Sequence, residues 1–211
     1  MDTDESLEMV IEIKGSYWWY GLQQRESRLP AWVTGFHPQK MACEFEGAWI
    51  RGSFNVARKV VFTNREAWMV RFPMNGKAST ALLEEKVAQE VAALRLIREN
   101  TDIPVPEVKA WGLAKDNSLG LGPFIIEEFV EGESLKKCLC KPGSGLLSDG
   151  IEDERVEVIY RQLARFMLQL FKLNFSQIGP LPTESESTSR PQPLTIKAHE
   201  IYRLGGRRRL W

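Results

Sequence analysis

Hydrophobic and polar residues alternate with a period of two in two consecutive stretches of the chain, 54–62 and 67–72, and Pro73 follows the second of them. A short strand candidate at 44–50 precedes them. Alternation of this kind is typical of strands with one buried and one exposed face, and proline cannot continue a central strand. The pattern therefore predicts three consecutive β-strands joined by short turns.

A helical period replaces the alternation in residues 79–100, and two further strand candidates follow at 108–113 and 124–130. In the helical stretch, apolar residues recur three or four positions apart, which places them on one face of a helix. These residues are Leu83, Val87, Val91 and Leu94. One long helix among five strands indicates an α+β fold, with a five-stranded antiparallel sheet on which the helix packs.

The second half of the chain shows one more strong helical pattern. After a short helical turn from Glu133 and a loop over 141–150, a stretch that begins at Asp153 carries an apolar stripe. The stripe consists of Val156, Ile159, Leu163, Phe166 or Met167, and Leu170. A helix with such a stripe buries it against another element. If the stripe has no partner within the chain, we expect the protein to associate with another molecule or to be unstable.

The two ends of the chain carry weaker patterns. Residues 1–41 are interpreted as an N-terminal extension, in which Tyr17-Trp18-Trp19-Tyr20 forms an aromatic cluster without a clear period. This cluster either packs against the folded domain, which is the commoner role of such residues, or forms a docking patch. Residues 183–211 are interpreted as a flexible loop and tail, because 183–189 are polar throughout.

Charge and composition narrow the class of protein. The 211 residues carry a formal net charge of +0 at pH 7, which gives no reason to expect binding to nucleic acid or to an anionic membrane. No apolar run approaches membrane-spanning length, and residues 1–5 are acidic where a secretory signal is basic. Three cysteines are too few for a disulfide framework. We therefore expect a soluble, cytoplasmic protein with reduced thiols.

The segment between the first two predicted strands, Gly52-Ser53-Phe54-Asn55, is a candidate phosphate-binding turn. A glycine and small polar residues at a hairpin tip allow backbone N–H groups to approach phosphate oxygens. The segment does not have the G-x-G-x-x-G pattern, and a single glycine between two strands is more often only a turn. Both interpretations stay open at this point.

Arg71 and Glu90 form a second candidate site. Alternation places Arg71 on the strand face opposite Val70 and Phe72, and Glu90 lies beside the apolar stripe of the predicted helix. A strand cation paired with a helix carboxylate can position nucleotide phosphates, and arginine binds oxyanions through two parallel hydrogen bonds. The same pair can instead brace the helix against the sheet as a structural ion pair. By residue type alone, the two interpretations are even.

The last predicted strand supplies a third candidate. Phe124-Ile125-Ile126 runs into the polar segment 127–131 and ends at Gly132. An apolar strand that leads into a polar segment and a glycine matches a hinge whose exposed backbone groups pair with the edge of an adenine. An edge strand that ends in an ordinary turn gives the same pattern and is commoner.

Several segments together resemble the fungal branch of the aminoglycoside phosphotransferase family. They are Gly52–Asn55, Val70–Pro73, Glu84–Arg95, Ile103–Pro106 and Leu119–Ile126, within a resemblance that runs from about Ala42 to Gly205. The resemblance implies a protein-kinase-like fold, with an N-terminal lobe over 42–132 and the first helices of an incomplete C-terminal lobe over 133–182. It also implies transfer of the ATP γ-phosphoryl group to a small-molecule hydroxyl, with ATP and Mg²⁺ as cofactors.

The same resemblance assigns roles to the candidate residues. Arg71 takes the phosphate-contacting place on the third strand, Glu90 is its helix partner, and residues 128–130 form the adenine hinge. The implied nucleotide-binding set is Gly52, Ser53, Phe54, Asn55, Arg71, Glu90, Glu128, Phe129 and Val130.

The chain lacks the catalytic machinery of that family. Neither His37 nor His199 opens an H-G-D-x-x-x-x-N loop, and no aspartate follows Asp153. Phosphoryl transfer in kinase-like folds needs an aspartate that orients the acceptor hydroxyl and further groups that hold Mg²⁺. We therefore assign no catalytic and no metal-binding residue. Glu127 stands where relatives usually have an apolar residue behind the adenine, which predicts weak binding of ATP and Mg²⁺.

Two functional hypotheses follow from these patterns. The first is a truncated small-molecule kinase, a fragment whose catalytic half is missing and which transfers no phosphoryl group by itself. The alternative is a non-catalytic, pseudokinase-like binding or interaction module, which presents an apolar surface to a partner. No nucleic acid or membrane partner is expected, and the acceptor substrate and the oligomeric state stay open.

Overall fold

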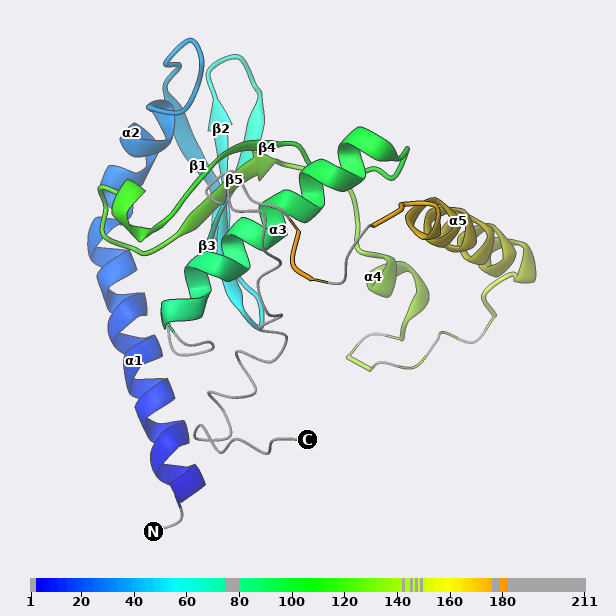
Figure 1. Cartoon of the computed structure of the whole chain (residues 1–211), viewed down its shortest axis with the longest axis horizontal. Coiled ribbons are helices and arrows are strands. Elements are labelled where there is room, and N and C mark those ends of the chain that lie inside the picture. Colours follow the sequence, from blue (N-terminus) through cyan, green and yellow to red (C-terminus); the bar gives the residue numbers. More distant parts are fainter. Residues whose placement is uncertain are drawn as a thin grey trace. The chain divides into compact units, whose positions relative to one another are not determined.

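The computed structural model describes residues 3–74, 80–141, 143, 144, 146, 148, 150–175 and 179–181. The order of the helices and strands is shown in Figure 1. The elements are α1 (Thr3–Arg25), the 3-10 helix η1 (Glu26–Arg28), α2 (Leu29–Thr34), β1 (Cys43–Arg51), β2 (Asn55–Phe62), β3 (Ala67–Pro73), α3 (Thr80–Asn100), β4 (Val108–Gly112), the 3-10 helix η2 (Ala114–Asp116), β5 (Phe124–Glu128), α4 (Leu135–Leu139) and α5 (Asp153–Phe171).

The strands of the described residues form one five-stranded sheet in the order β1-β2-β3-β5-β4. Every neighbouring pair in this order is antiparallel. Each strand overlaps a stretch that was predicted as a strand, and α3 falls within the predicted range of 79–100. The predicted α+β fold, an antiparallel five-stranded sheet that carries one long helix, is therefore confirmed.

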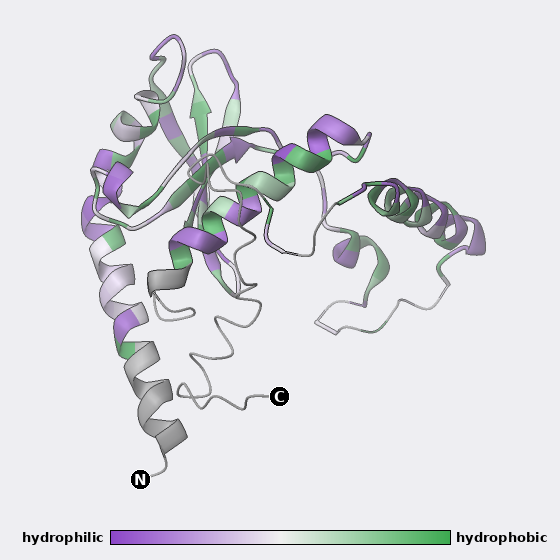
Figure 2. Ribbon diagram, viewed as in Figure 1, coloured by the Kyte–Doolittle hydropathy of each residue, from purple (hydrophilic) through white to green (hydrophobic). Residues whose placement is uncertain are grey.

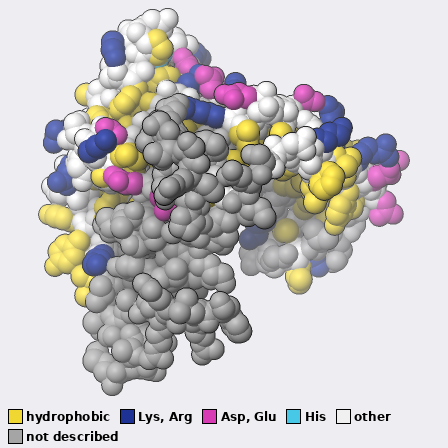
Figure 3. All heavy atoms as spheres, in the orientation of Figure 1, with side chains coloured by type: hydrophobic (Ala, Val, Ile, Leu, Met, Phe, Trp, Pro, Cys, Tyr) yellow, Lys and Arg dark blue, Asp and Glu magenta, His cyan; other side chains and the backbone are white. Residues whose placement is uncertain are grey.

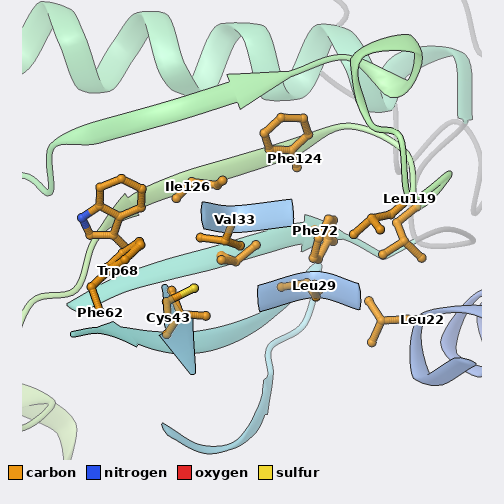
Figure 4. Close-up of a cluster of buried hydrophobic side chains, with 13 residues drawn as sticks. Leu22, Leu29, Val33, Cys43, Phe62, Trp68, Phe72, Leu119, Phe124 and Ile126 are labelled. Atoms are coloured by element: carbon orange, nitrogen blue, oxygen red, sulfur yellow. The ribbon is translucent and has the colours of Figure 1, made fainter. Parts of the chain in front are cut away.

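Buried apolar side chains fill the face of the sheet that lies against α1 and α2 (Figure 4). Alternate residues of β2, β3 and β5 point to this face because successive side chains of a strand point to opposite sides. The cluster consists of Leu22, Leu29, Val33, Cys43, Val60, Phe62, Trp68, Val70, Phe72, Leu119, Leu121, Phe124 and Ile126. Full burial of one large apolar side chain contributes about 1.5–3 kcal/mol, so this cluster is a main source of stability.

Two N-terminal helices take part in this core, although the sequence pattern predicted no helix before residue 79. Leu22 of α1 and Leu29 and Val33 of α2 have no exposed surface. Pro30 lies in the first turn of α2, where its missing N–H removes no helical hydrogen bond. The sequence hid these helices because its apolar, aromatic and polar residues before position 35 do not recur at a helical spacing.

In the aromatic cluster of α1, two residues pack against the domain and two are exposed, so neither of the two predicted roles applies to the whole cluster. Trp18 and Trp19 pack against the apolar core, and the indole Nε1 of Trp18 donates a hydrogen bond to the carbonyl of Leu121 at 3.1 Å. Tyr17 and Tyr20 are exposed. Packing against the domain is thus the role of the two tryptophans, which attach α1 to the loop before β5.

The α3 helix covers the opposite face of the sheet. Val87 and Val91 pack against Ile125 of β5, with side chains of β4 at the margin. Leu83 is buried as well, whereas Leu94 is only partly buried. The predicted packing of the helix on the sheet is confirmed, and it rests on fewer apolar side chains than the packing on the other face.

The described residues divide into two units. The first unit holds the whole sheet, α1, α2 and the beginning of α3, and the second holds the end of α3 with residues 101–105, α4 and α5. In the second unit, the side chain of Ser134 caps α4 by accepting a hydrogen bond from the N–H of Lys137. No helix among the described residues is both long enough and apolar enough to cross a membrane. The predicted loop and tail at 183–211 lies outside the described residues.

Candidate functional site

Three charged side chains meet between β3, β5 and α3 and form a largely buried ionic cluster. Arg71 is in the middle of β3, Glu127 is near the end of β5, and Glu90 is on α3. One terminal nitrogen of Arg71 lies 2.7 Å from Glu90 Oε1 and donates a hydrogen bond of 2.9 Å to Glu127 Oε2. Arg71 Nε lies 2.8 Å from Glu127 Oε1. The predicted pairing of Arg71 with Glu90 is present.

Sequence reasoning missed the role of Glu127 as the second partner of Arg71. Pairing of β3 with β5 sets Met69 opposite Glu127 and Arg71 opposite Ile125, so all four side chains are on the face of the sheet that α3 covers. The sequence treated Glu127 only as an obstacle behind a bound base. The pairing of Glu127 with Arg71 could have been predicted from the position of Glu127 in an apolar strand. A carboxylate buried in such a strand requires a cation nearby.

Burial and mutual attraction both change the ionisation of this cluster. For Arg71, burial acts to lower the pKa, but the charges of Glu90 and Glu127 together outweigh it, and the pKa lies above its ordinary value. For Glu127, burial raises the pKa, and the attraction of Arg71 offsets this only in part. The cluster therefore holds a fixed cation between two carboxylates, one of which is ionised at some cost.

These contacts limit what Arg71 can bind. Its nitrogens already face two carboxylates, and an incoming anion would have to displace one of them and leave a buried negative charge without a partner. Breaking a buried ion pair in this way is strongly unfavourable. The sequence did not favour either phosphate binding or a structural ion pair for Arg71. The contacts observed are those of an ion pair that braces α3 against the sheet. A contact with nucleotide phosphate stays a prediction.

Two backbone hydrogen bonds hold the Gly52–Asn55 turn, one within the turn and one from Met74. The N–H of Gly52 donates to the carbonyl of Asn55 at 2.9 Å, and the carbonyl of Phe54 accepts from the N–H of Met74 at 2.8 Å. Ser53 is exposed. The Phe54 ring lies under the ammonium group of Lys86 from α3, with 4.9 Å between Nζ and the ring centroid. The turn is thus attached to α3 through a cation–π contact that the sequence did not predict.

The predicted hinge residues contact other parts of the sheet. The N–H of Glu128 donates to the carbonyl of Glu107 at 2.8 Å, and the N–H of Phe129 donates to the carbonyl of Ala67 at 3.0 Å. Lys59 Nζ lies 4.2 Å from the centroid of the Phe129 ring. Val130 begins the longer segment of the second unit and is 63% exposed. The structure therefore joins Arg71 to Glu90 and Phe54 to α3, whereas Glu128 and Phe129 contact neighbouring strands. Their role as an adenine hinge stays a prediction.

A second candidate site is the apolar side of α5. No residue of α5 is buried, and hydrophobic and hydrophilic residues lie on different sides of this helix (Figure 2). We define the α5 apolar face as the predicted stripe together with two further aromatic residues: Val156, Ile159, Tyr160, Leu163, Phe166, Met167, Leu170 and Phe171. Met167 is 70% exposed and Phe171 is 86% exposed. Figure 3 shows hydrophobic side chains gathered at the surface over α5.

The polar side of α5 is occupied by contacts within the second unit. Arg165 forms an ion pair of 2.8 Å with the carboxylate of Asp102, and Gln169 accepts a hydrogen bond of 2.7 Å from the N–H of Asp102. Arg161 pairs with Glu157 one turn earlier. These contacts hold the polar side of α5. On the α5 apolar face, Val156, Ile159 and Phe166 are partly buried and the other residues are exposed.

Comparisons with known proteins place the chain near one group of relatives. No protein family model matches it. It is 28% identical over 132 residues to Altered inheritance of mitochondria protein 9, mitochondrial, of Debaryomyces hansenii, a match that covers 62% of this chain and 20% of the relative. For the proteins of the same name the values are 26% over 131 residues in Candida albicans, covering 62% and 20%, and 24% over 160 residues in Meyerozyma guilliermondii, covering 75% and 25%. The chain thus spans about a fifth to a quarter of the length of these relatives.

These relatives correct the functional hypothesis drawn from the sequence. They are named for the inheritance of mitochondria and not as aminoglycoside phosphotransferases, so the assignment to that family is wrong, and with it the truncated ATP-binding transferase. The resemblance rested on short segments with turn glycines, prolines and apolar strands, which any antiparallel sheet carrying one helix also contains. Segments of that kind report a fold and not a function.

The expected location is corrected as well. The cytoplasm was inferred from the acidic residues 1–5 and from composition, whereas the relatives are named as mitochondrial proteins. Composition and the charge of a few residues do not distinguish one compartment of the cell from another.

Proposed function

We propose that this chain is a non-catalytic interaction module of mitochondria, which binds an amphipathic helix of a protein partner through the α5 apolar face. The observation that carries the proposal is the exposure of that face. It presents a continuous row of large apolar side chains, none of which is buried by the described residues. Exposed apolar patches of this kind mark interaction sites on soluble proteins.

The spacing of the α5 apolar face suits a helical partner. Ile159, Leu163 and Met167 follow one another at intervals of four residues, and Phe166 and Leu170 fill the row beside them. Side chains three and four residues apart form the ridges that pack into the grooves of a second helix. Recognition of an amphipathic helix through such anchors is a common mode of peptide binding.

Charge supports a protein partner over an anionic one. The formal net charge of the chain is +0, and the arginines of α5 at positions 161 and 165 are paired with carboxylates of the second unit. Binding to nucleic acid or to anionic lipid requires clustered cations that are available to phosphate groups. The contact is therefore expected to rest on apolar burial, with little dependence on salt.

The relatives suggest both the compartment and a source of the partner helix. They are named as mitochondrial, and the match to this chain covers only 20% of the Debaryomyces hansenii protein. In that protein, the unmatched part belongs to the same polypeptide as a region similar to this chain. We therefore expect the partner helix to resemble a segment from that unmatched part.

The ionic cluster of Arg71, Glu90 and Glu127 supports the proposal that the module is non-catalytic. The one cation that the sequence offered for phosphate contact is held by Glu90 and Glu127 at distances of 2.7 and 2.8 Å. A cation fixed in this way stabilises the fold and is not free to stabilise charge that develops in a transition state.

Peptide binding tests the proposal. Overlapping fluorescent peptides of about 25 residues, long enough for stable amphipathic helices, are made from the unmatched part of the Debaryomyces hansenii relative and titrated with the whole chain. At least one amphipathic peptide is expected to bind. Leu163→Asp should weaken its binding about tenfold or more, because a charge replaces a central anchor. Gln162→Asp places the same charge one residue away on the exposed polar side and should leave the affinity unchanged.

Two outcomes contradict the proposal. The first is that no peptide binds, or that both aspartate variants bind equally. The second is that the chain forms a stable dimer that Leu163→Asp dissociates, because the face is then occupied by a second copy. Circular dichroism of both variants checks that α5 remains helical in each.

A further inference from the structure

One side-chain amide of α3 pairs with both backbone polar groups of a residue that is 92 positions away in the sequence. Gln89 Nε2 donates a hydrogen bond of 3.0 Å to the carbonyl of Leu181, and Gln89 Oε1 accepts one of 2.8 Å from the N–H of Leu181. A primary amide holds a donor and an acceptor side by side, so it can satisfy both groups of one residue, as a neighbouring strand does. Gln89 therefore recognises backbone at this point and not a particular side chain.

The sequence around Leu181 prepares this residue for such a contact. Leu181 stands between Pro180 and Pro182. A residue before proline is restricted to extended backbone, and proline itself has no N–H. Leu181 thus carries the only backbone N–H of these three residues, and the sequence favours the extended conformation that pairing with an amide needs. Little conformational entropy is lost when a segment restricted in this way is bound.

The side of α3 around Gln89 leaves room for a passing chain. Positions three and four residues apart lie on the same side of a helix, which sets Ala92 and Ala93 next to Gln89. Alanine has no side-chain atom beyond Cβ, so extended backbone can approach the helix closely there. Residues 179–181 are each partly buried. The segment is therefore packed against the protein in addition to being held by the two hydrogen bonds.

We propose that the side of α3 around Gln89 is a binding site for an extended, proline-flanked peptide, and that the chain's own segment around Leu181 occupies it. The site is separate from the α5 apolar face and goes beyond the proposed function. Its affinity comes from main-chain hydrogen bonds, as in strand addition, and its specificity from prolines that fix the backbone of the ligand.

Amide hydrogen exchange, followed by NMR in the whole chain, tests the contact. The N–H of Leu181 should exchange about tenfold or more faster in Gln89→Ala, because its acceptor is removed. Gln89→Glu keeps an acceptor for this N–H but loses the donor to the Leu181 carbonyl, so its increase should be smaller. The matched control is Gln162→Ala on α5, which removes a glutamine amide elsewhere and should leave the Leu181 rate unchanged. The amides of Val87 and Val91 report whether α3 stays helical.

A second measurement distinguishes a binding site from a contact that exists only within one chain. Leu181→Pro removes the N–H at this position from the whole chain and should leave Gln89 open to another ligand. A fluorescent peptide with the sequence of residues 177–185 is then titrated with the chain. It should bind Leu181→Pro at least about tenfold more tightly than the unaltered chain, whose own segment competes at high effective concentration. The double variant with Gln89→Ala should not bind the peptide.

The proposal is overturned if the N–H of Leu181 exchanges equally fast in the unaltered chain and in Gln89→Ala, because another group then protects it. It is also overturned if the peptide binds the unaltered chain, Leu181→Pro and the double variant equally, or binds none of them. Binding to none would show that the contact forms only between parts of one chain. Neither result bears on the α5 apolar face, which is tested with different peptides.

Discussion

The face of the sheet against α1 and α2 is apolar, whereas the face against α3 combines a small apolar cluster with buried charges. On the first face, thirteen buried side chains pack together. On the second, Val87, Val91 and Ile125 form the apolar contact, and Arg71 with its two carboxylates supplies the rest. Apolar packing is non-directional, whereas an ion pair works only in one geometry. The first face therefore supplies most of the stability, and the second fixes how α3 lies on the sheet.

The largest effect is expected from a cavity on the apolar face. Phe72 has no exposed surface and contacts the core under α2. Phe72→Ala should lower the free energy of unfolding by about 3–5 kcal/mol, the range for large aromatic side chains removed from cores. Urea denaturation measures the loss. Val130→Ala, at a position that is 63% exposed, is the control and should change the free energy by less than about 0.5 kcal/mol.

The charged face is tested by removing its cation. Arg71→Met keeps the side-chain volume but leaves Glu90 and Glu127 without a partner. The cost should be about 2–3 kcal/mol at neutral pH, below the range for fully buried pairs because the site is partly exposed. Acid should reduce this cost, since the two carboxylates can then be protonated. A cost that is independent of pH would show that packing, and not charge, joins α3 to the sheet.

A close approach within the sheet gives the next effect. A Cβ atom at Gly112 of β4 would lie 2.7 Å from a ring carbon of Phe124 and 3.0 Å from Cβ of Asp116. Gly112→Ala should therefore cost about 1–3 kcal/mol through overpacking. Thermal unfolding measures the cost, and the double variant with Phe124→Leu should recover part of it. Additive losses in the double variant would mean that the ring is not the obstacle.

The smallest effect concerns the pH dependence of the charged face. The pKa of Glu127 is raised by burial, so the folded state binds its proton more tightly than the unfolded state does. Ionising Glu127 therefore reduces stability as the pH rises from the unfolded value of about 4.5 through the folded pKa, and the penalty is complete above it. Glu127→Gln should remove this negative slope in denaturation curves taken across that window. At neutral pH it should change the free energy of unfolding by less than about 1 kcal/mol, because Glu90 still pairs with Arg71.

The two faces also differ in how well the sequence predicted them. Alternation identified β2 and β3, and the spacing of Val87 and Val91 identified α3, because burial on one side leaves a regular period. β5 was predicted from its apolar run between turn residues. The α1 and α2 helices were missed, because the apolar and aromatic residues of this stretch do not recur at a helical spacing. The ion pair of Arg71 with Glu90 was predicted because the strand face of Arg71 and the helix face of Glu90 were expected to meet. Its second partner, Glu127, was missed because strand pairing between β3 and β5 was needed to bring it close.

The functional hypothesis failed for a related reason. The segments that suggested a kinase, such as the Gly52–Asn55 turn, describe how a chain reverses between strands, and many unrelated proteins reverse in the same way. The α5 apolar face was predicted from spacing alone. Its exposure was not, because a periodic stripe indicates that a helix has an apolar side but does not say what covers it.

The first strand of the sheet has a consequence for solubility. β1 lies at one end of the strand order, and its pairing with β2 shifts register between Glu46 and Ile50, with Gly47 in a left-handed conformation at φ 74°. A straight strand at an open edge invites the strands of neighbouring molecules to add to it, the first step toward fibrous aggregates. A bulge bends such an edge, and the exposed carboxylate of Glu44 adds a charge to it. The irregularity in β1 thus protects the concentrated protein against growth of the sheet from one molecule to the next.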